Sequence, residues 1–161
     1  MKKIALLITF FSILIFSCKD DKSTTEDSVT VATNAESKDY DVEKGIGFWT
    51  AENLKLSETI DTSLATKGEL LHNLHCASCH NLNSETLVGP GWKGILKRRK
   101  PEWIMNYINN PEAMIDKDPE LKKEYEKCYI RMPDPHLSET DARSLLEFIR
   151  LNETKGYHFF H

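Results

Sequence analysis

The sequence predicts an all-α domain between about residues 61 and 151, and three features indicate this fold class. Helix-capping residues stand before several segments, and apolar residues recur within those segments at helical spacing. No segment alternates apolar and polar residues as a half-buried strand does. The domain lies near the lower size limit for a self-sufficient hydrophobic core. We therefore expect short helices joined by long loops.

The first two predicted helices have clear starts. Asp61 is a residue type that caps helix N-termini, and the helix after it carries Leu64 and Leu71 toward residue 76. Pro101 suits the first turn of the second helix, which should stop before Pro111. Two i,i+4 pairs give the second helix an apolar face, Trp103 with Tyr107 and Ile104 with Ile108.

Two more helices are predicted toward the C-terminus. Asp118 followed by Pro119 is typical of a helix start, and one face of that helix carries Leu121, Tyr125, Cys128 and Tyr129. Because Cys128 shares this apolar face, we expect a small buried thiol that is chemically inert. Ser138 and Asp141 resemble a capping box with Asp in place of Glu. Four apolar residues follow at helical spacing: Ala142, Leu145, Leu146 and Ile149.

The first 17 residues have the pattern of a lipoprotein signal peptide. Lys2 and Lys3 precede an apolar run over residues 4–16, which is too short to span a membrane and is typical of a signal sequence. Residues 15–18 resemble a bacterial lipobox, which implies cleavage before Cys18 and a lipid on its sulfur. An ordinary secretory signal with an incidental cysteine is the alternative. In both cases we expect the protein in the cell envelope, facing the periplasm or the outside.

Composition divides the rest of the chain into further segments. Residues 18–40 are rich in Ser, Thr, Asp, Glu and Lys, which predicts a disordered, lipidated tether. Residues 41–60 are more apolar and predict an irregular arm that packs on the domain of residues 61–155, and residues 156–161 form a tail. Without residues 1–17, the 21 basic residues fall to 19 against 25 acidic ones, a formal charge of −6. This charge argues against a nucleic-acid partner.

Cys76-Ala77-Ser78-Cys79-His80 is the most specific pattern in the chain. C-x-x-C-H is the attachment sequence of a c-type haem. Cysteines three residues apart lie on one helical face and can form thioethers to both vinyl groups of one haem, while the histidine binds its iron. A thioredoxin-like pair would follow a strand, and a zinc site would need two further ligands at matching spacing. Neither context is found, so we predict one covalent haem.

At this motif the chain resembles class I cytochromes c, and the resemblance implies their fold. Gly68 resembles the glycine at which the first and last helices of that family cross closely. Leu87-Val88-Gly89-Pro90 resembles the Gly-Pro loop of the family. The resemblance implies that the carbonyl of Pro90 accepts a hydrogen bond from His80 and orients its ring. An ordinary turn at this position is the alternative.

The second axial ligand of the iron has several candidates. Met132 stands in a proline-containing loop before the last helix, where class I cytochromes carry their axial methionine, and the resemblance implies this role. His136 is the rival; bis-histidine ligation would lower the reduction potential, whereas Met/His ligation raises it. The other candidates are Met105 and Met114, which we expect to be packing residues, and His158 and His161 in the tail.

Five basic residues stand together in this otherwise acidic chain: Lys93, Lys97, Arg98, Arg99 and Lys100. Such a run is commonly a solvated face. Family members place haem-propionate partners in this region, so the resemblance makes Arg98, Arg99 and the Trp103 indole N–H candidates for that role. We expect the lysines near the haem edge, where they would dock an acidic surface of a redox partner.

The resemblance implies a monomeric electron carrier that makes and breaks no substrate bonds. It would pass one electron at a time from a membrane donor to a terminal reductase. Residues 98–105 and 110–114 further resemble small cytochromes of Bacteroidetes found with nitrous oxide reductase, although the usual Gly-Ile-Gly-Pro arm reads Gly45-Ile46-Gly47-Phe48 here. A haem-based ligand sensor or small peroxidase with a labile sixth ligand is the alternative function.

Overall fold

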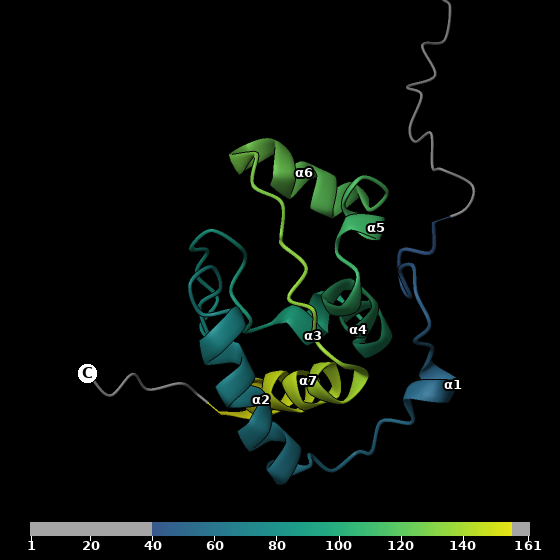
Figure 1. Cartoon of the computed structure of the whole chain (residues 1–161), viewed down its shortest axis with the longest axis vertical. Coiled ribbons are helices and arrows are strands. Elements are labelled where there is room, and N and C mark those ends of the chain that lie inside the picture. The colour runs from purple at the N-terminus through teal and green to yellow at the C-terminus, as the bar shows by residue number, and fades with distance from the viewer. Residues whose placement is uncertain (1–39, 156–161) are drawn as a thin grey trace, which may run out of the picture. The chain divides into compact units, whose positions relative to one another are not determined.

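The computed structural model describes residues 40–155, which form helices and loops with no strand in that range (Figure 1). The helices are α1 (Ala51–Leu54), α2 (Thr62–His75), α3 (Ile95–Arg98), α4 (Pro101–Asn109), α5 (Glu112–Ile115), α6 (Pro119–Cys128) and α7 (Glu139–Thr154). The prediction of an all-α fold is confirmed. The signal peptide, Cys18, residues 18–39 of the tether and the tail with His158 and His161 lie outside the described residues.

The predicted helix starts are confirmed by their capping geometry. Asp61 accepts hydrogen bonds from the backbone N–H groups of residues 63 and 64, and Asp118 does the same for residues 120 and 121. Ser138 accepts one from the N–H of Asp141. The single-turn helices α1, α3 and α5 were not predicted, and α1 corrects the expectation of a wholly irregular arm. Four residues are too few to show a helical period.

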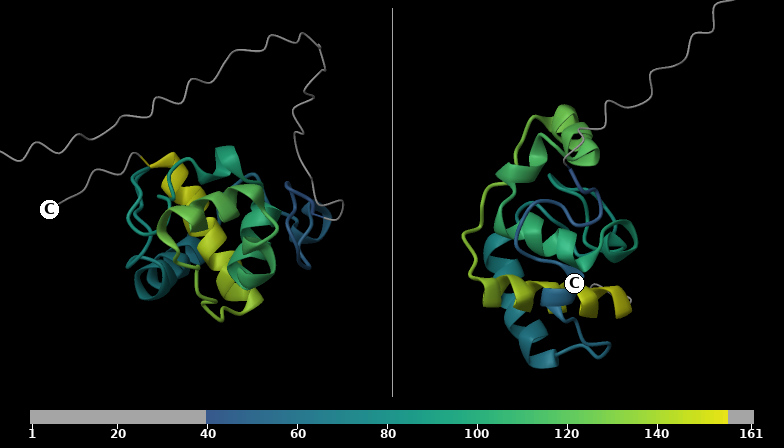
Figure 2. Two further views of the ribbon diagram at one scale, coloured as in Figure 1. Left: turned by 90° about the horizontal axis from the view of Figure 1, so that it is seen from above. Right: turned by 90° about the vertical axis from the view of Figure 1, so that its right-hand side faces the viewer.

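Helices α2 and α7 cross at one end of the domain, and α6 lies at the other end (Figure 1, Figure 2). Gly68 is buried at the crossing. A Cβ atom on this residue would lie 2.1 Å from the backbone oxygen of Ser144 and 2.7 Å from the Cβ of Phe148. Only glycine therefore permits so close an approach, as the resemblance implied.

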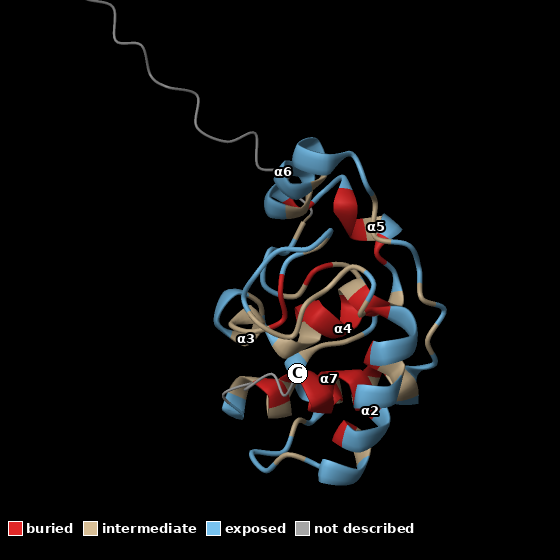
Figure 3. Ribbon diagram, turned by 90° about the vertical axis from the view of Figure 1, so that its left-hand side faces the viewer, coloured by how far each residue is buried: buried red, intermediate tan, exposed pale blue. Residues whose placement is uncertain are grey.

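The hydrophobic core lies between α4 and α7, whose inward faces are buried (Figure 3). The fully buried apolar side chains of the core include Met105, Ile108, Met114, Leu145, Leu146 and Ile149. Glu147 is also buried, and its carboxylate pairs with Arg143 at 3.1 Å and Arg150 at 2.8 Å. A buried charge is tolerated when it is paired in this way.

Helix α6 differs from the expectation, because none of its residues is buried (Figure 3). Leu121 and Tyr125 are half-buried, whereas Cys128 is exposed, which corrects the prediction of a buried thiol. Tyr129 is 75% exposed and ends the helix in a left-handed conformation with φ 55°. The apolar face of α6 lies along a cavity, which Leu121, Tyr125 and Cys128 help to line.

The arm predicted for residues 41–60 lies against the domain through specific hydrogen bonds. Tyr40, predicted as part of the tether, belongs with the arm because its hydroxyl donates a hydrogen bond to Asp118. Buried Asn106 of α4 accepts from the N–H of Trp49 and donates to the carbonyl oxygens of Lys44 and Trp49. Arg143 of α7 donates to the carbonyl oxygen of Leu54 at 2.7 Å. The arm is therefore packed as part of the domain. No helix within residues 40–155 is long and apolar enough to cross a membrane.

Candidate functional site

The C-x-x-C-H motif forms a tight turn at the C-terminal end of α2. The backbone N–H groups of Cys79 and His80 both donate to the carbonyl oxygen of Cys76, at 3.0 and 2.9 Å. Neither cysteine forms a disulfide; Cys76 is buried, and Cys79 lies on the wall of a cavity. Burial, together with the neighbouring Cys79, raises the pKa of Cys76 to about 11, so this thiol is uncharged at neutral pH.

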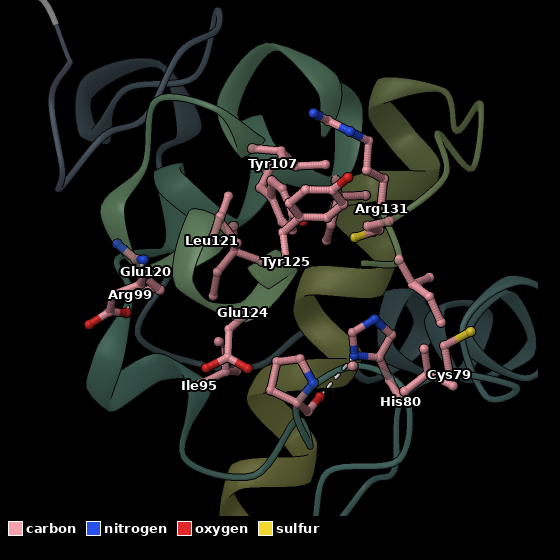
Figure 4. A pocket seen from close by; sticks show the side chains of 18 of the residues that line it. Cys79, His80, Ile95, Arg99, Tyr107, Glu120, Leu121, Glu124, Tyr125 and Arg131 are labelled. Atoms are coloured by element: carbon pink, nitrogen blue, oxygen red, sulfur yellow. Dashed lines mark hydrogen bonds and ion pairs between the residues drawn. The ribbon is translucent and has the colours of Figure 1, made fainter. Parts of the chain in front are cut away.

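His80 is oriented by the loop that follows the motif (Figure 4). Its Nδ1 lies 2.8 Å from the carbonyl oxygen of Pro90, the hydrogen bond that the resemblance implied. Since a carbonyl can only accept, Nδ1 carries the proton and Nε2 keeps its lone pair. Burial lowers the pKa of His80, which favours this neutral ring.

Gly89 and Trp92 fix the surroundings of the His80 ring. A Cβ atom on Gly89 would lie 2.3 Å from Cε1 of His80, so the loop approaches the imidazole more closely than any other residue would allow. The Trp92 indole also packs near the ring, with its centroid 5.0 Å from that of His80. Trp92 is itself buried and lines the same cavity, a role that sequence reasoning missed.

The cavity beside His80 has a volume of about 400 Å³ and is lined mainly by apolar side chains (Figure 4). Its walls come from the loop after the motif, from α4, and from α6 with the segment that follows it. The apolar residues along it include Val88, Ile95, Ile104, Ile108, Leu121 and Ile130. A cavity of this size suits a cofactor. Its composition fits an apolar ring system, with a neutral imidazole at its edge to bind iron.

Met132 lines this cavity, and the rival His136 does not. The His136 side chain is 86% exposed, and its Nδ1 faces the Asp134 carboxylate at 3.4 Å. Met105 and Met114 are fully buried in the core and are absent from the cavity wall. Met114 packs on Gly45 of the arm. Within residues 40–155, Met132 is thus the only one of these four candidates beside the cavity.

The two arginines and the tryptophan expected near the propionates share the cavity wall but differ in their hydrogen-bond partners. Arg98, Arg99 and Trp103 all line the cavity. The Trp103 indole N–H, however, donates to the Tyr40 hydroxyl at 3.0 Å and to Asp118 at 3.2 Å. Arg99 lies 4.1 Å over the Trp103 ring and 2.7 Å from Asp118. In the structure these donors have a buried carboxylate as partner, and the propionate role of Arg99 and Trp103 stays a prediction. Among the described residues, Arg98 donates to the carbonyl oxygen of Gly91 alone, at 3.3 Å.

Comparison with known proteins gives one family. A family model described as Cytochrome c matches residues 65–152. The solved structure of cytochrome c from Rhodothermus marinus is 40% identical, with a TM-score of 0.59 over 62% of this chain and 84% of that one. An engineered cytochrome c from the same organism, Rma TDE, is 39% identical over 62% and 86% of the two chains, with a TM-score of 0.59. The same engineered protein bound to a carbene intermediate is 40% identical with a TM-score of 0.56 over the same shares.

No curated protein matches the chain. The family match covers more than half of the chain and includes the C-x-x-C-H motif, the cavity and Met132. The helical fold without strands in residues 40–155 agrees with it. The protein therefore belongs to the cytochrome c family, as a class I c-type cytochrome that carries covalently attached haem c and serves as a haem-based electron carrier.

Proposed function

We propose that Cys76 and Cys79 would attach the haem, and that His80 and Met132 would both bind its iron. The observation that carries this proposal is that His80 and Met132 line one cavity, with His80 already oriented by Pro90. Each thiol would add across a vinyl group: its sulfur bonds to one carbon, and its hydrogen ends on the other. This addition needs no external oxidant. When bound, the haem supplies one-electron redox chemistry.

The chain's own residues would tune that chemistry. The Pro90 carbonyl holds His80 Nδ1–H, which fixes the tautomer and makes Nε2 a better ligand. Trp92 is buried and, with the apolar walls, would keep water away from a bound iron. Met132 in place of a second histidine favours the ferrous state and raises the reduction potential. Arg98, Arg99 and Trp103 all stand on the cavity wall and are the candidates for the propionates.

The absorption spectrum of the ferric holoprotein tests the ligand assignment. If Met132 binds iron, the wild type shows the weak near-infrared band of sulfur-ligated ferric haem, and Met132→Ala abolishes it and lowers the potential. Met114→Leu is the matched control, since this buried residue is absent from the cavity wall and the exchange conserves volume. A band that survives Met132→Ala would overturn the assignment.

Carbon monoxide separates the electron carrier from the alternative function. A ligand sensor or small peroxidase needs an open or easily vacated sixth position. We expect the ferrous wild type to resist carbon monoxide and Met132→Ala to bind it readily. Rapid binding to the wild type would favour the sensor or peroxidase instead.

We also propose that the basic segment, residues 93–100, docks an acidic surface of a terminal reductase, with nitrous oxide reductase as the leading partner. Lys97 is exposed, whereas Lys100 pairs with Glu43 of the arm. Exposed apolar side chains also flank the cavity, Val88 and Ile130 among them. A patch of this kind suits a transient, electrostatically steered encounter.

Charge reversal tests the docking proposal. Changing Lys93, Lys97 and Lys100 to Glu should slow electron transfer to the partner several-fold at low salt and little at high salt, because salt screens exposed charges. The control variant changes three other lysines to Glu: Lys117, which lies between α5 and α6, and Lys122 and Lys127 of α6. It has the same net charge as the first variant. Equal rates for the wild type and the first variant at low salt would show that the segment is only a solvated face.

Anchoring through a lipid on Cys18 remains part of the proposal and is supported by the sequence pattern of residues 1–18. Fractionation of cells that express the full chain tests it. The wild type should sediment with membranes, and Cys18→Ser should be released into the soluble envelope fraction. Membrane retention of Cys18→Ser would favour some other mode of attachment.

A further inference from the structure

Asp118 lies at the centre of a buried polar cluster between the arm and α6. Its side chain is fully buried, and one of its oxygens accepts from the Tyr40 hydroxyl at 2.7 Å and from the Trp103 indole at 3.2 Å. The other oxygen accepts from Arg99 at 2.7 Å and from the backbone N–H groups of residues 120 and 121. We call these four residues, Tyr40, Arg99, Trp103 and Asp118, the Asp118 cluster.

The Asp118 cluster joins parts of the chain that are distant in sequence. Tyr40 belongs to the arm, Arg99 to the link between α3 and α4, and Trp103 to α4. Asp118 is the N-cap of α6. The cluster therefore fixes the start of α6 to three other elements. Burial and the hydrogen bond to Asp118 raise the pKa of Tyr40 well above its usual range, so its hydroxyl keeps the proton that it donates.

Helix α6 is held to the rest of the described protein mainly at its two ends, because its apolar face lines the cavity. It covers one side of the haem cavity with Leu121 and Tyr125 (Figure 4). Cys128 lines the same cavity. At its other end, Arg131 pairs with Glu112 at 3.1 Å and Asp116 at 2.8 Å, but those two carboxylates are exposed. Exposed ion pairs stabilise a structure little, whereas a buried carboxylate that accepts from five donors stabilises it more. The end of α6 at Asp118 is therefore the more strongly attached.

The chain runs only a few residues from the end of α6 to Met132, which lies on the same cavity wall. A displacement of α6 would therefore carry the segment of Met132 with it. We propose that the Asp118 cluster is a positioning device that holds α6 over the cavity, and that Tyr40 thereby couples the arm to the retention of the sixth ligand. This inference rests on the proposed ligation by Met132.

Imidazole binding to the ferric holoprotein measures how often the sixth position opens. The apparent affinity of an added ligand is proportional to the fraction of molecules in the competent, open state. We expect Tyr40→Phe, which removes one donor and keeps the ring, to bind imidazole several-fold more tightly than the wild type. Asp118→Asn, which weakens the bond to Arg99 as well, should have a larger effect.

Trp49→Phe is the matched control within the arm. It removes the indole hydrogen bond to Asn109 of α4 at 3.1 Å, and Trp49 makes no bond to the cluster. We expect imidazole to bind this variant within two-fold of the wild type. Unchanged affinity in Tyr40→Phe, or an equal gain in Trp49→Phe, would overturn the positioning role, since the effect would then be absent or a general loosening of the arm.

The Met132→Ala background separates this inference from the ligand assignment. Without a ligand to displace, Tyr40→Phe should no longer change the imidazole affinity if the cluster acts through Met132. If the wild type shows the sulfur band but Tyr40→Phe gains no affinity, the inference fails while the ligand assignment stands. If the wild type lacks that band, the ligand assignment fails and the inference falls with it.

Discussion

Gly68→Ala offers a strict test of the crossing between α2 and α7. The added Cβ atom would lie 2.1 Å from the backbone oxygen of Ser144 and 2.6 Å from its carbonyl carbon. An ordinary contact begins at 3.4 Å, so the helices would have to separate by about 1.3 Å at this point. A backbone carbonyl in the middle of α7 cannot rotate away as a flexible side chain can.

The magnitude follows from two opposing effects. Overpacking a tight core costs about 1–3 kcal/mol, and the rigid obstacle places this site at the upper end of that range. Alanine also favours a helix over glycine by about 1 kcal/mol, which offsets part of the cost. We therefore expect Gly68→Ala to lower the free energy of unfolding by about 2 kcal/mol, the difference between these two effects.

Guanidinium denaturation of the haem-loaded protein, followed by far-ultraviolet circular dichroism, measures this change. Glu69→Ala is the control, because it places alanine at an exposed position of the same helix, next to the crossing. It should alter the free energy of unfolding by less than about 0.5 kcal/mol. If Gly68→Ala were as stable as the wild type, the two helices could not be as close as described, and the reasoning would be refuted.

Three further changes have defined outcomes. Glu147→Gln should lower the free energy of unfolding by about 3 kcal/mol in denaturant titrations, because Arg143 and Arg150 lose a buried carboxylate. Cys128→Ala should change it by less than about 0.5 kcal/mol in the same assay, since this side chain is exposed. Burial alone would raise the pKa of Asp118, but bonds from Tyr40, the backbone and Arg99 hold it below the usual 3.8. The charged carboxylate therefore stabilises the fold fully above pH 3.8, and this stabilisation is lost at lower pH. In acid titrations, the free energy of unfolding of Asp118→Asn should fall less steeply with decreasing pH than that of the wild type.

The parts of the fold that the sequence predicted correctly depend on neighbouring residues. Asp61, Asp118 and Ser138 cap helices through backbone N–H groups two or three residues away, so the residue types alone indicate the starts. The bond from His80 to Pro90 spans ten residues within one loop. The resemblance to a known family could imply this bond, because both of its partners lie in sequence motifs of that family.

The face of α6 shows the limit of periodicity. Leu121, Tyr125 and Cys128 recur at helical spacing, which correctly indicated an apolar side. Periodicity does not say what that side meets, and here it meets the cavity of a cofactor rather than a second helix. The buried position was therefore the wrong part of the prediction, because Cys128 is exposed, whereas its chemical inertness stays a prediction.

The same limit explains why the partners of Trp103 were missed. Its position beside the basic segment favoured a propionate, yet its indole N–H donates to Tyr40, 63 residues earlier in the chain, and to Asp118. Asp118 was identified only as a cap, although the oxygen that caps α6 also holds Arg99 and the second oxygen holds Tyr40, 78 residues away. A carboxylate has room for both tasks, since its two oxygens accept about four hydrogen bonds between them. Local sequence patterns indicate only the first task, the capping of α6. The second task depends on contacts between the arm and α6, which are distant in sequence and meet only in the folded protein.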